Sequence, residues 1–146
     1  MINGQIEILL VEDNPDDVVL TLDTLRSLNI TSPVGVVRDG AEAIEFIFCT
    51  GAYSRRTRYN PKLVLLDLKL PNVDGHQVLR RIKSDPDTQM IPVVIFTTSR
   101  EERDVITSYR LGTNGYVVKP IDFDQIIEAV QQLGMFWLLR NEAPPP

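Results

Sequence analysis

Cysteine is almost absent from this sequence. Cys49 is the single cysteine among 146 residues, which excludes an internal disulfide and a metal site built from several cysteines. No apolar run reaches the roughly 18 residues that a membrane-spanning helix needs. The N-terminal residues have neither the basic start nor the apolar stretch of a signal peptide. We therefore expect a protein of the reducing cytoplasm that has no membrane partner.

Basic residues are in the minority. Fifteen Lys and Arg against 20 Asp and Glu give a formal net charge of −5, which argues against nucleic acid as a direct partner. No glycine-rich phosphate-binding loop follows the first apolar run. The residues at that position are acidic instead. Apolar residues make up 43% and charged residues 24% of the chain. These proportions and this length are typical of one globular domain.

Short apolar runs rich in β-branched residues recur along the chain. They cover residues 8–11, 63–66, 93–96 and 116–118, with a weaker run at 34–37. Runs that are apolar at every position predict strands buried on both faces of a parallel sheet. Segments with helical periodicity separate the runs. The alternation predicts an α/β fold in which five helices surround a doubly wound five-stranded parallel sheet.

The strong apolar runs end in reactive side chains, namely Glu12 with Asp13, Asp67, Thr97 and Lys119. Ligands of open parallel sheets bind beyond the carboxyl ends of the strands. Three carboxylates gathered there need a cation, and such oxygen ligands suit Mg²⁺. A lysine and a hydroxyl suit a phosphoryl group. The pattern predicts a magnesium-dependent phosphoryl site with a carboxylate nucleophile. The alternative is that each acidic residue only caps a helix or forms a turn.

Four motifs, in this order, resemble the receiver domain of two-component response regulators. They are V-E-D-N at 11–14, L-D-L-K-L-P-N-V-D-G at 66–75, F-T at 96–97 and K-P at 119–120. The resemblance covers about residues 6–133. It implies a flavodoxin-like (CheY-like) fold with strand order 2-1-3-4-5.

The resemblance also implies roles for the acidic residues. Asp67 is the phosphoacceptor, and it takes its phosphoryl group from the phosphohistidine of a sensor histidine kinase. Mg²⁺ binds Asp13, Asp67 and the backbone carbonyl of Lys69, while Glu12 acts mostly through a metal-bound water. Phosphorylation and dephosphorylation are self-catalysed, so the chain is a signalling phosphoprotein and not an enzyme.

Three further roles follow from the same resemblance. Lys119 pairs with the phosphoryl group, and its bond to Pro120 is a candidate cis peptide. Thr97 hydrogen-bonds a phosphoryl oxygen, and Tyr116 then turns inward. A phosphoryl group adds about two negative charges and three acceptors, so this contact can bias a two-state equilibrium. The surface of helix 4, strand 5 and helix 5 changes for partner binding or phosphorelay.

Residues 134–146 are an apolar and proline-rich C-terminal extension, and we expect no output domain. Apolar side chains lie on all sides of its helix, so we expect a homodimer through helix 5 and this extension. The candidate dimer residues are Met135, Phe136, Trp137, Leu138 and Leu139. The alternative is that the extension folds back onto its own domain.

A long loop at 49–62 also narrows the choice of subfamily within the receiver family. The loop and the extension resemble stand-alone regulators of bacterial phytochromes, which implies a phytochrome-type kinase as phosphodonor. We expect the loop residues Arg55, Arg56 and Arg58 to be solvated, and likewise the single histidine, His76.

Three other functions fit the sequence less well. A phosphatase of the haloacid dehalogenase type needs a second aspartate two residues after the nucleophile, where this chain has Lys69. A flavin- or nucleotide-binding protein needs the missing glycine-rich loop. A receiver-like protein that binds partners without phosphorylation usually lacks a site residue, whereas this chain has them all.

Overall fold

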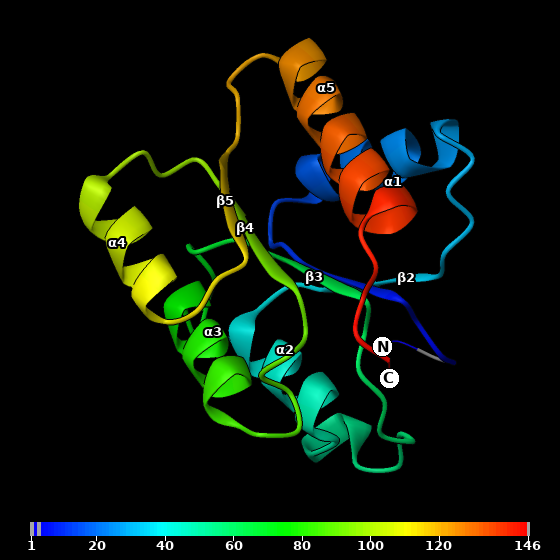
Figure 1. Cartoon of the computed structure of the whole chain (residues 1–146), viewed down its shortest axis with the longest axis vertical. Coiled ribbons are helices and arrows are strands. Elements are labelled where there is room, and N and C mark those ends of the chain that lie inside the picture. The colour runs from blue at the N-terminus through cyan, green and yellow to red at the C-terminus, as the bar shows by residue number, and fades with distance from the viewer. Residues whose placement is uncertain (1, 3, 146) are drawn as a thin grey trace.

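The sheet has the topology that the sequence predicts. In the computed structural model, which describes residue 2 and residues 4–145, five parallel strands lie in the order β2-β1-β3-β4-β5 (Figure 1). The strands are β1 (Ile8–Val11), β2 (Val34–Val37), β3 (Leu63–Leu66), β4 (Val93–Thr97) and β5 (Gly115–Val118). The predicted strand order 2-1-3-4-5 is therefore confirmed.

Helices connect the strands and cover both faces of the sheet. They are α1 (Pro15–Ser27), α2 (Gly40–Phe48), α3 (Gly75–Ser84), α4 (Glu102–Arg110) and α5 (Phe123–Gly134). α1 packs with α5 on one face, while α2, α3 and α4 follow one another on the other (Figure 1). Within the described part of the chain, no helix is long and apolar enough to cross a membrane.

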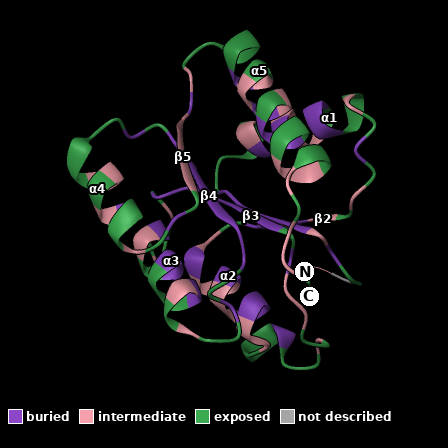
Figure 2. Cartoon of the chain, in the orientation of Figure 1, coloured by how far each residue is buried: buried purple, intermediate pink, exposed green. Residues whose placement is uncertain are grey.

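The core consists of two layers that share the strands. Leu9 and Val11 face the α2 and α3 side, whereas Ile8 and Leu10 face the α1 and α5 side. β1, β3 and β4 are buried at every position (Figure 2). This explains why their sequences are apolar without alternation. The edge strand β5 is only half-buried.

The helix starts bring polar groups to the carboxyl edge of the sheet. Asn14 caps α1 and accepts hydrogen bonds from the backbone N–H groups of Asp16 and Asp17. Gly75 begins α3 directly against β3: a Cβ atom there would lie 2.2 Å from the carbonyl oxygen of Asp67. Glycine is therefore required where α3 passes over the residue that follows β3.

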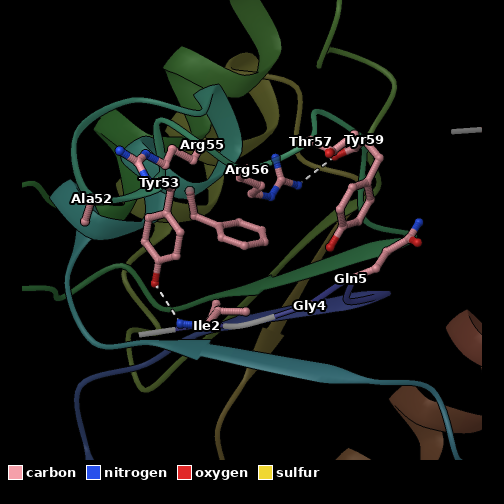
Figure 3. A pocket seen from close by; sticks show the side chains of 10 residues that line it. Ile2, Gly4, Gln5, Ala52, Tyr53, Arg55, Arg56, Thr57 and Tyr59 are labelled. Atoms are coloured by element: carbon pink, nitrogen blue, oxygen red, sulfur yellow. Dashed lines mark hydrogen bonds between the residues drawn. The ribbon is translucent and has the colours of Figure 1, made fainter.

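The long loop before β3 is more ordered than its polar sequence suggests. The Arg56 guanidinium lies over the rings of Phe46 and Tyr59, at 4.0 and 4.4 Å from their centroids (Figure 3). It also lines a cavity of about 490 Å³ beside the N-terminal segment. The expectation that all three loop arginines are solvated is wrong for Arg56, because aromatic faces hold it. Arg55 and Arg58 are exposed.

The C-terminal extension continues α5 as a π-helical segment, Met135–Arg140. Trp137 and Leu138 pack against the chain's own core on the α1 and α5 side. Met135, Phe136 and Leu139 are 51%, 53% and 60% exposed. Beyond the helix, residues 141–145 line a cleft together with residues 5–7, at the amino edge of the sheet (Figure 1). The extension therefore folds back in part and leaves three of the five candidate dimer residues open.

Candidate phosphoryl site

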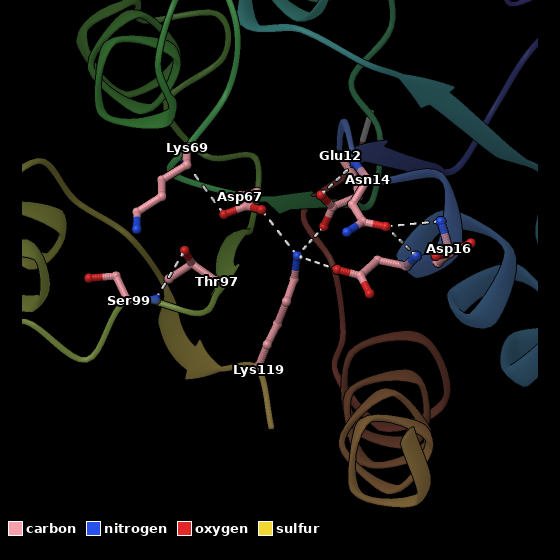
Figure 4. A network of polar contacts seen from close by, with 9 residues as sticks. Glu12, Asn14, Asp16, Asp67, Lys69, Thr97, Ser99 and Lys119 are labelled. Carbon is pink, nitrogen blue, oxygen red and sulfur yellow. Dashed lines mark hydrogen bonds and ion pairs between the residues drawn. The ribbon is translucent and has the colours of Figure 1, made fainter. Parts of the chain in front are cut away.

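The structure brings the predicted site residues together at one edge of the sheet (Figure 4). Glu12 and Asp13 follow β1, Asp67 follows β3, Thr97 ends β4 and Lys119 follows β5. Parallel strands share their direction, so residues from four strand ends far apart in the sequence meet in one place.

Three carboxylates form a cluster that could hold a cation. Glu12, Asp13 and Asp67 each offer an oxygen atom, and these atoms lie within 4.8 Å of one another. Glu12 and Asp67 are buried, whereas Asp13 is exposed. Hard oxygen donors beside solvent suit Mg²⁺, which keeps several waters in its coordination shell. The donor chemistry therefore fits the predicted metal.

The Lys119 ammonium compensates this negative charge. It donates to the carboxylates of Glu12, Asp17 and Asp67, and the last two are 3.0 and 3.1 Å away. Burial raises the pKa of the Glu12 carboxyl, and the charge of Lys119 opposes this rise. Burial alone would lower the pKa of Lys119, but the charges of Glu12 and Asp67 hold it above its ordinary value. Lys119 therefore stays charged inside the site.

Sequence reasoning missed Asp17. It lies in the first turn of α1, and its contact with Lys119 spans 102 residues. An acidic residue in the first turn of a helix usually stabilises the helix itself through its dipole. The sequence pattern therefore did not indicate that Asp17 belongs to the site. The position of this turn at the carboxyl edge of the sheet was the only available signal.

Two backbone features beside the site bear on the predictions. The Lys69 N–H donates to the Asp67 carboxylate at 3.4 Å, and the Lys69 side chain is exposed. The Lys119–Pro120 bond is trans, since the described residues contain no cis peptide. The cis candidate was therefore wrong, in line with the usual preference of prolyl bonds for the trans form.

Thr97 and Tyr116 meet at one residue, Ser99. The buried Thr97 hydroxyl accepts a hydrogen bond from the Ser99 N–H at 3.5 Å, and the Tyr116 hydroxyl donates to the Ser99 carbonyl at 2.9 Å. The Tyr116 side chain is half-buried and packs against the core. The end of β4 and the edge strand β5 are thus linked through the loop that leads to α4.

His76 is not the solvated helix residue that we expected. It is half-buried, and its Nε2 lies 3.0 Å from the Ser108 hydroxyl. Ser108 is on α4, so the imidazole bridges α3 and α4. The packing of these two helices against each other brings His76 inward.

These features define a flavodoxin-like receiver fold, with strand order 2-1-3-4-5 and an acidic cluster beside a buried lysine. The chain belongs to the response regulator receiver domain family, whose model matches residues 8–131. This confirms the family that the sequence motifs indicated.

The relatives also confirm the subfamily. The chain is 43% identical over 131 residues to response regulator Rcp1 of Synechocystis sp., covering 90% of this chain and 88% of Rcp1. The crystal structure of Mn²⁺-bound Rcp1 has a TM-score of 0.90 at 41% identity, covering 96% of this chain and 99% of that one. The phosphorylated cyanobacterial phytochrome response regulator RcpA has a TM-score of 0.89 at 40% identity, with coverages of 97% and 99%.

Proposed function

We propose that this chain accepts a phosphoryl group on Asp67 from a phytochrome-type sensor histidine kinase in the cytoplasm. The observation that carries the proposal is the 3.1 Å contact of Lys119 with Asp67, inside a cluster of three carboxylates. The nucleophile, a metal site and a counter-charge for the phosphoryl group thus stand together. The relationship to RcpA, a cyanobacterial phytochrome response regulator whose structure is that of the phosphorylated protein, supports the kinase class and the chemistry.

The reaction needs few groups. A carboxylate oxygen of Asp67 attacks the phosphorus, and the bond from phosphorus to the donor nitrogen breaks. Asp13, Asp67 and the Lys69 carbonyl would hold Mg²⁺ directly, with Glu12 acting through water, and the ion would neutralise developing charge. Lys119 keeps its protons and pairs with the phosphoryl oxygens. Water later cleaves the acyl phosphate, so the protein is phosphorylated and restored without turning over a metabolite.

The response travels through Thr97 and Tyr116. A phosphoryl oxygen draws the Thr97 hydroxyl toward Asp67, and the Ser99 backbone that contacts both side chains moves with it. A contact present in only one state shifts the equilibrium between two conformations. The readout is the surface of α4, β5 and α5, which binds a partner or passes the phosphoryl group on, without direct contact to nucleic acid.

The receiver unit covers residues 6–133. The extension at 134–146 and α5 together form the interface of a homodimer. The support is the exposed group of Met135, Phe136 and Leu139 on the continuation of α5. A two-fold axis beside this helix would bury the three apolar side chains against their copies.

Intact mass after incubation with acetyl phosphate tests the chemistry. We expect the mass of one phosphoryl group to be added only with Mg²⁺, and not in Asp67→Asn. The control is Asp87→Asn, which makes the same change at an exposed aspartate on the α3–β4 connection. Labelling of Asp67→Asn to the wild-type extent would refute the assignment.

Transfer from a purified, autophosphorylated phytochrome-type kinase tests the donor. We expect the label to pass to the wild-type chain within minutes and not to Asp67→Asn. A histidine kinase with an unrelated sensor is the comparison. Equal transfer from both kinases would remove the phytochrome pathway while leaving the receiver chemistry in place.

A further inference from the structure

All three N–H groups of the Lys119 ammonium are already engaged. Their acceptors are the carboxylates of Glu12, Asp17 and Asp67. An ammonium group has three donors and no more. A phosphoryl oxygen can therefore gain a direct bond from Lys119 only when one of these three contacts is given up or shared.

The three acceptors differ in how well water can reach them. The side chains of Glu12 and Asp67 are 4% and 11% exposed, whereas that of Asp17 is 19% exposed. Asp17 also borders an open cleft of about 480 Å³, which Lys119 and Phe123 help to line. A carboxylate that loses its partner is costly when buried and inexpensive when water replaces the partner. Asp17 is thus the contact that breaks most easily.

Asp17 also stands apart from the metal cluster. The carboxylates that converge within 4.8 Å are those of Glu12, Asp13 and Asp67. Asp17 comes from the first turn of α1 and reaches the site only through Lys119. Its charge therefore acts on the lysine without adding a ligand to the cluster.

We propose that Asp17 is a positioning residue that occupies one N–H of Lys119 in the unphosphorylated protein and yields it to the phosphoryl group. The inference rests on the proposed phosphorylation of Asp67. Until that step, the ion pair ties the first turn of α1 to the residue after β5. Phosphorylation breaks this ion pair, so α1 responds to the state of the site in addition to α4 and β5.

The chemistry of phosphorylation by acetyl phosphate explains why Asp17 should slow this reaction. An Asp67 oxygen forms the new bond to phosphorus, the bond from phosphorus to the acetyl oxygen breaks, and acetate leaves as an anion. Lys119 keeps its protons throughout. In this step Asp17 both holds the N–H that the phosphoryl group requires and adds a negative charge that repels the donor. Removing its charge should therefore speed phosphorylation.

The experiment compares Asp17→Asn with Asp16→Asn. Both variants remove one negative charge from the same helical turn, but Asp16 is exposed and is not an acceptor of Lys119. We expect Asp17→Asn to be phosphorylated by acetyl phosphate about 3- to 10-fold faster at saturating Mg²⁺, from the removal of one charge a few ångströms away. Asp16→Asn should stay within about twofold of the wild type. Asp17→Glu should restore the slower rate.

Magnesium affinity separates positioning from a structural role. We expect calorimetric titration with MgCl₂ to show that Asp17→Asn still binds Mg²⁺, at most about threefold more weakly than Asp16→Asn, because Asp17 is not a ligand and only its charge is lost. A rate for Asp17→Asn equal to or below that of Asp16→Asn overturns the inference. If the wild-type chain itself gains no phosphoryl group, the proposed function fails, and that result is distinct from equal rates in two phosphorylated variants.

Discussion

The hydroxyl of Tyr116 donates a hydrogen bond to the backbone carbonyl of Ser99, 2.9 Å away. The same Ser99 contacts Thr97 through its N–H. The aromatic side chain of the edge strand β5 is thereby coupled to the loop that follows the buried hydroxyl at the end of β4. A movement of Thr97 that shifts Ser99 would therefore also alter the contact made by Tyr116.

Tyr116→Phe tests how firmly this contact holds the loop. The variant keeps the ring and removes one partly buried donor, so the free energy of unfolding should fall by about 1 kcal/mol. Urea denaturation measures this value. Tyr109→Phe is the matched control, because Tyr109 is 54% exposed and makes no side-chain hydrogen bond within the described part of the chain. Equal losses in the two variants would mean that the contact contributes nothing.

Gly75→Ala should disturb the phosphoacceptor directly. Its Cβ would lie 2.2 Å from the Asp67 carbonyl oxygen, and backbone must move to make room. We expect a loss of about 2 kcal/mol in unfolding free energy and slower phosphorylation of Asp67. Helix propensity alone favours alanine by up to about 1 kcal/mol, so the expected loss isolates the steric contact.

Gly115→Ala is the control for that substitution. A Cβ at Gly115 would lie 3.7 Å from the methyl groups of Val94, which is an ordinary contact. Thermal unfolding and the rate of mass gain with acetyl phosphate should both stay near the wild type. A Gly75→Ala variant that resembles Gly115→Ala would show that α3 can shift away from Asp67 without cost.

Lys119→Met should separate metal binding from phosphorylation. Loss of the ammonium leaves the neighbouring carboxylates without their internal counter-charge, so Mg²⁺ should bind about 10-fold more tightly. Phosphorylation should nevertheless slow, because the phosphoryl group loses its cationic partner. Calorimetry and intact mass measure the two effects. Lys62→Met, which removes an exposed lysine paired with Glu7, should change neither, and weaker Mg²⁺ binding by Lys119→Met would contradict the prediction.

The dimer proposal predicts a specific sensitivity at the extension. Phe136→Glu combined with Leu139→Glu places two charges on the exposed apolar face, where burial against a second copy would be unfavourable. Sedimentation velocity should show a dimer for the wild type and a monomer for the double variant. Val19→Glu alters a side chain that is 58% exposed on α1 and should leave the dimer intact. A monomeric wild type would end the proposal.

The sequence predicted the site correctly where each strand can be recognised from its own residues. The runs ending at Asp67 and Thr97 are apolar at every position, so each predicts a strand, and parallel strands necessarily end at one edge. The residues of the acidic cluster could thus be placed together without knowing any distance. The strand order came from the family resemblance, because periodicity alone does not distinguish one order from another.

Contacts between elements that are distant in the sequence could not be predicted from the sequence alone. Asp17 meets Lys119 only because α1 and the segment after β5 approach each other. His76 faces Ser108 only because α3 packs beside α4. Arg56 looks like any loop arginine until the fold places aromatic rings around it. In each case the local pattern is that of a solvated polar residue, and tertiary packing decides otherwise.

Residues 5–7 and 141–145 line one cleft at the amino edge of the sheet, across the molecule from the acidic site (Figure 1). A domain whose two chain ends meet can be spliced into a surface loop of another protein with little strain. The receiver could thus be inserted as a unit, with its phosphoryl site still open to solvent on the far side. Such a fusion would leave Asp67 accessible to a histidine kinase, because the junction lies at the opposite edge of the sheet.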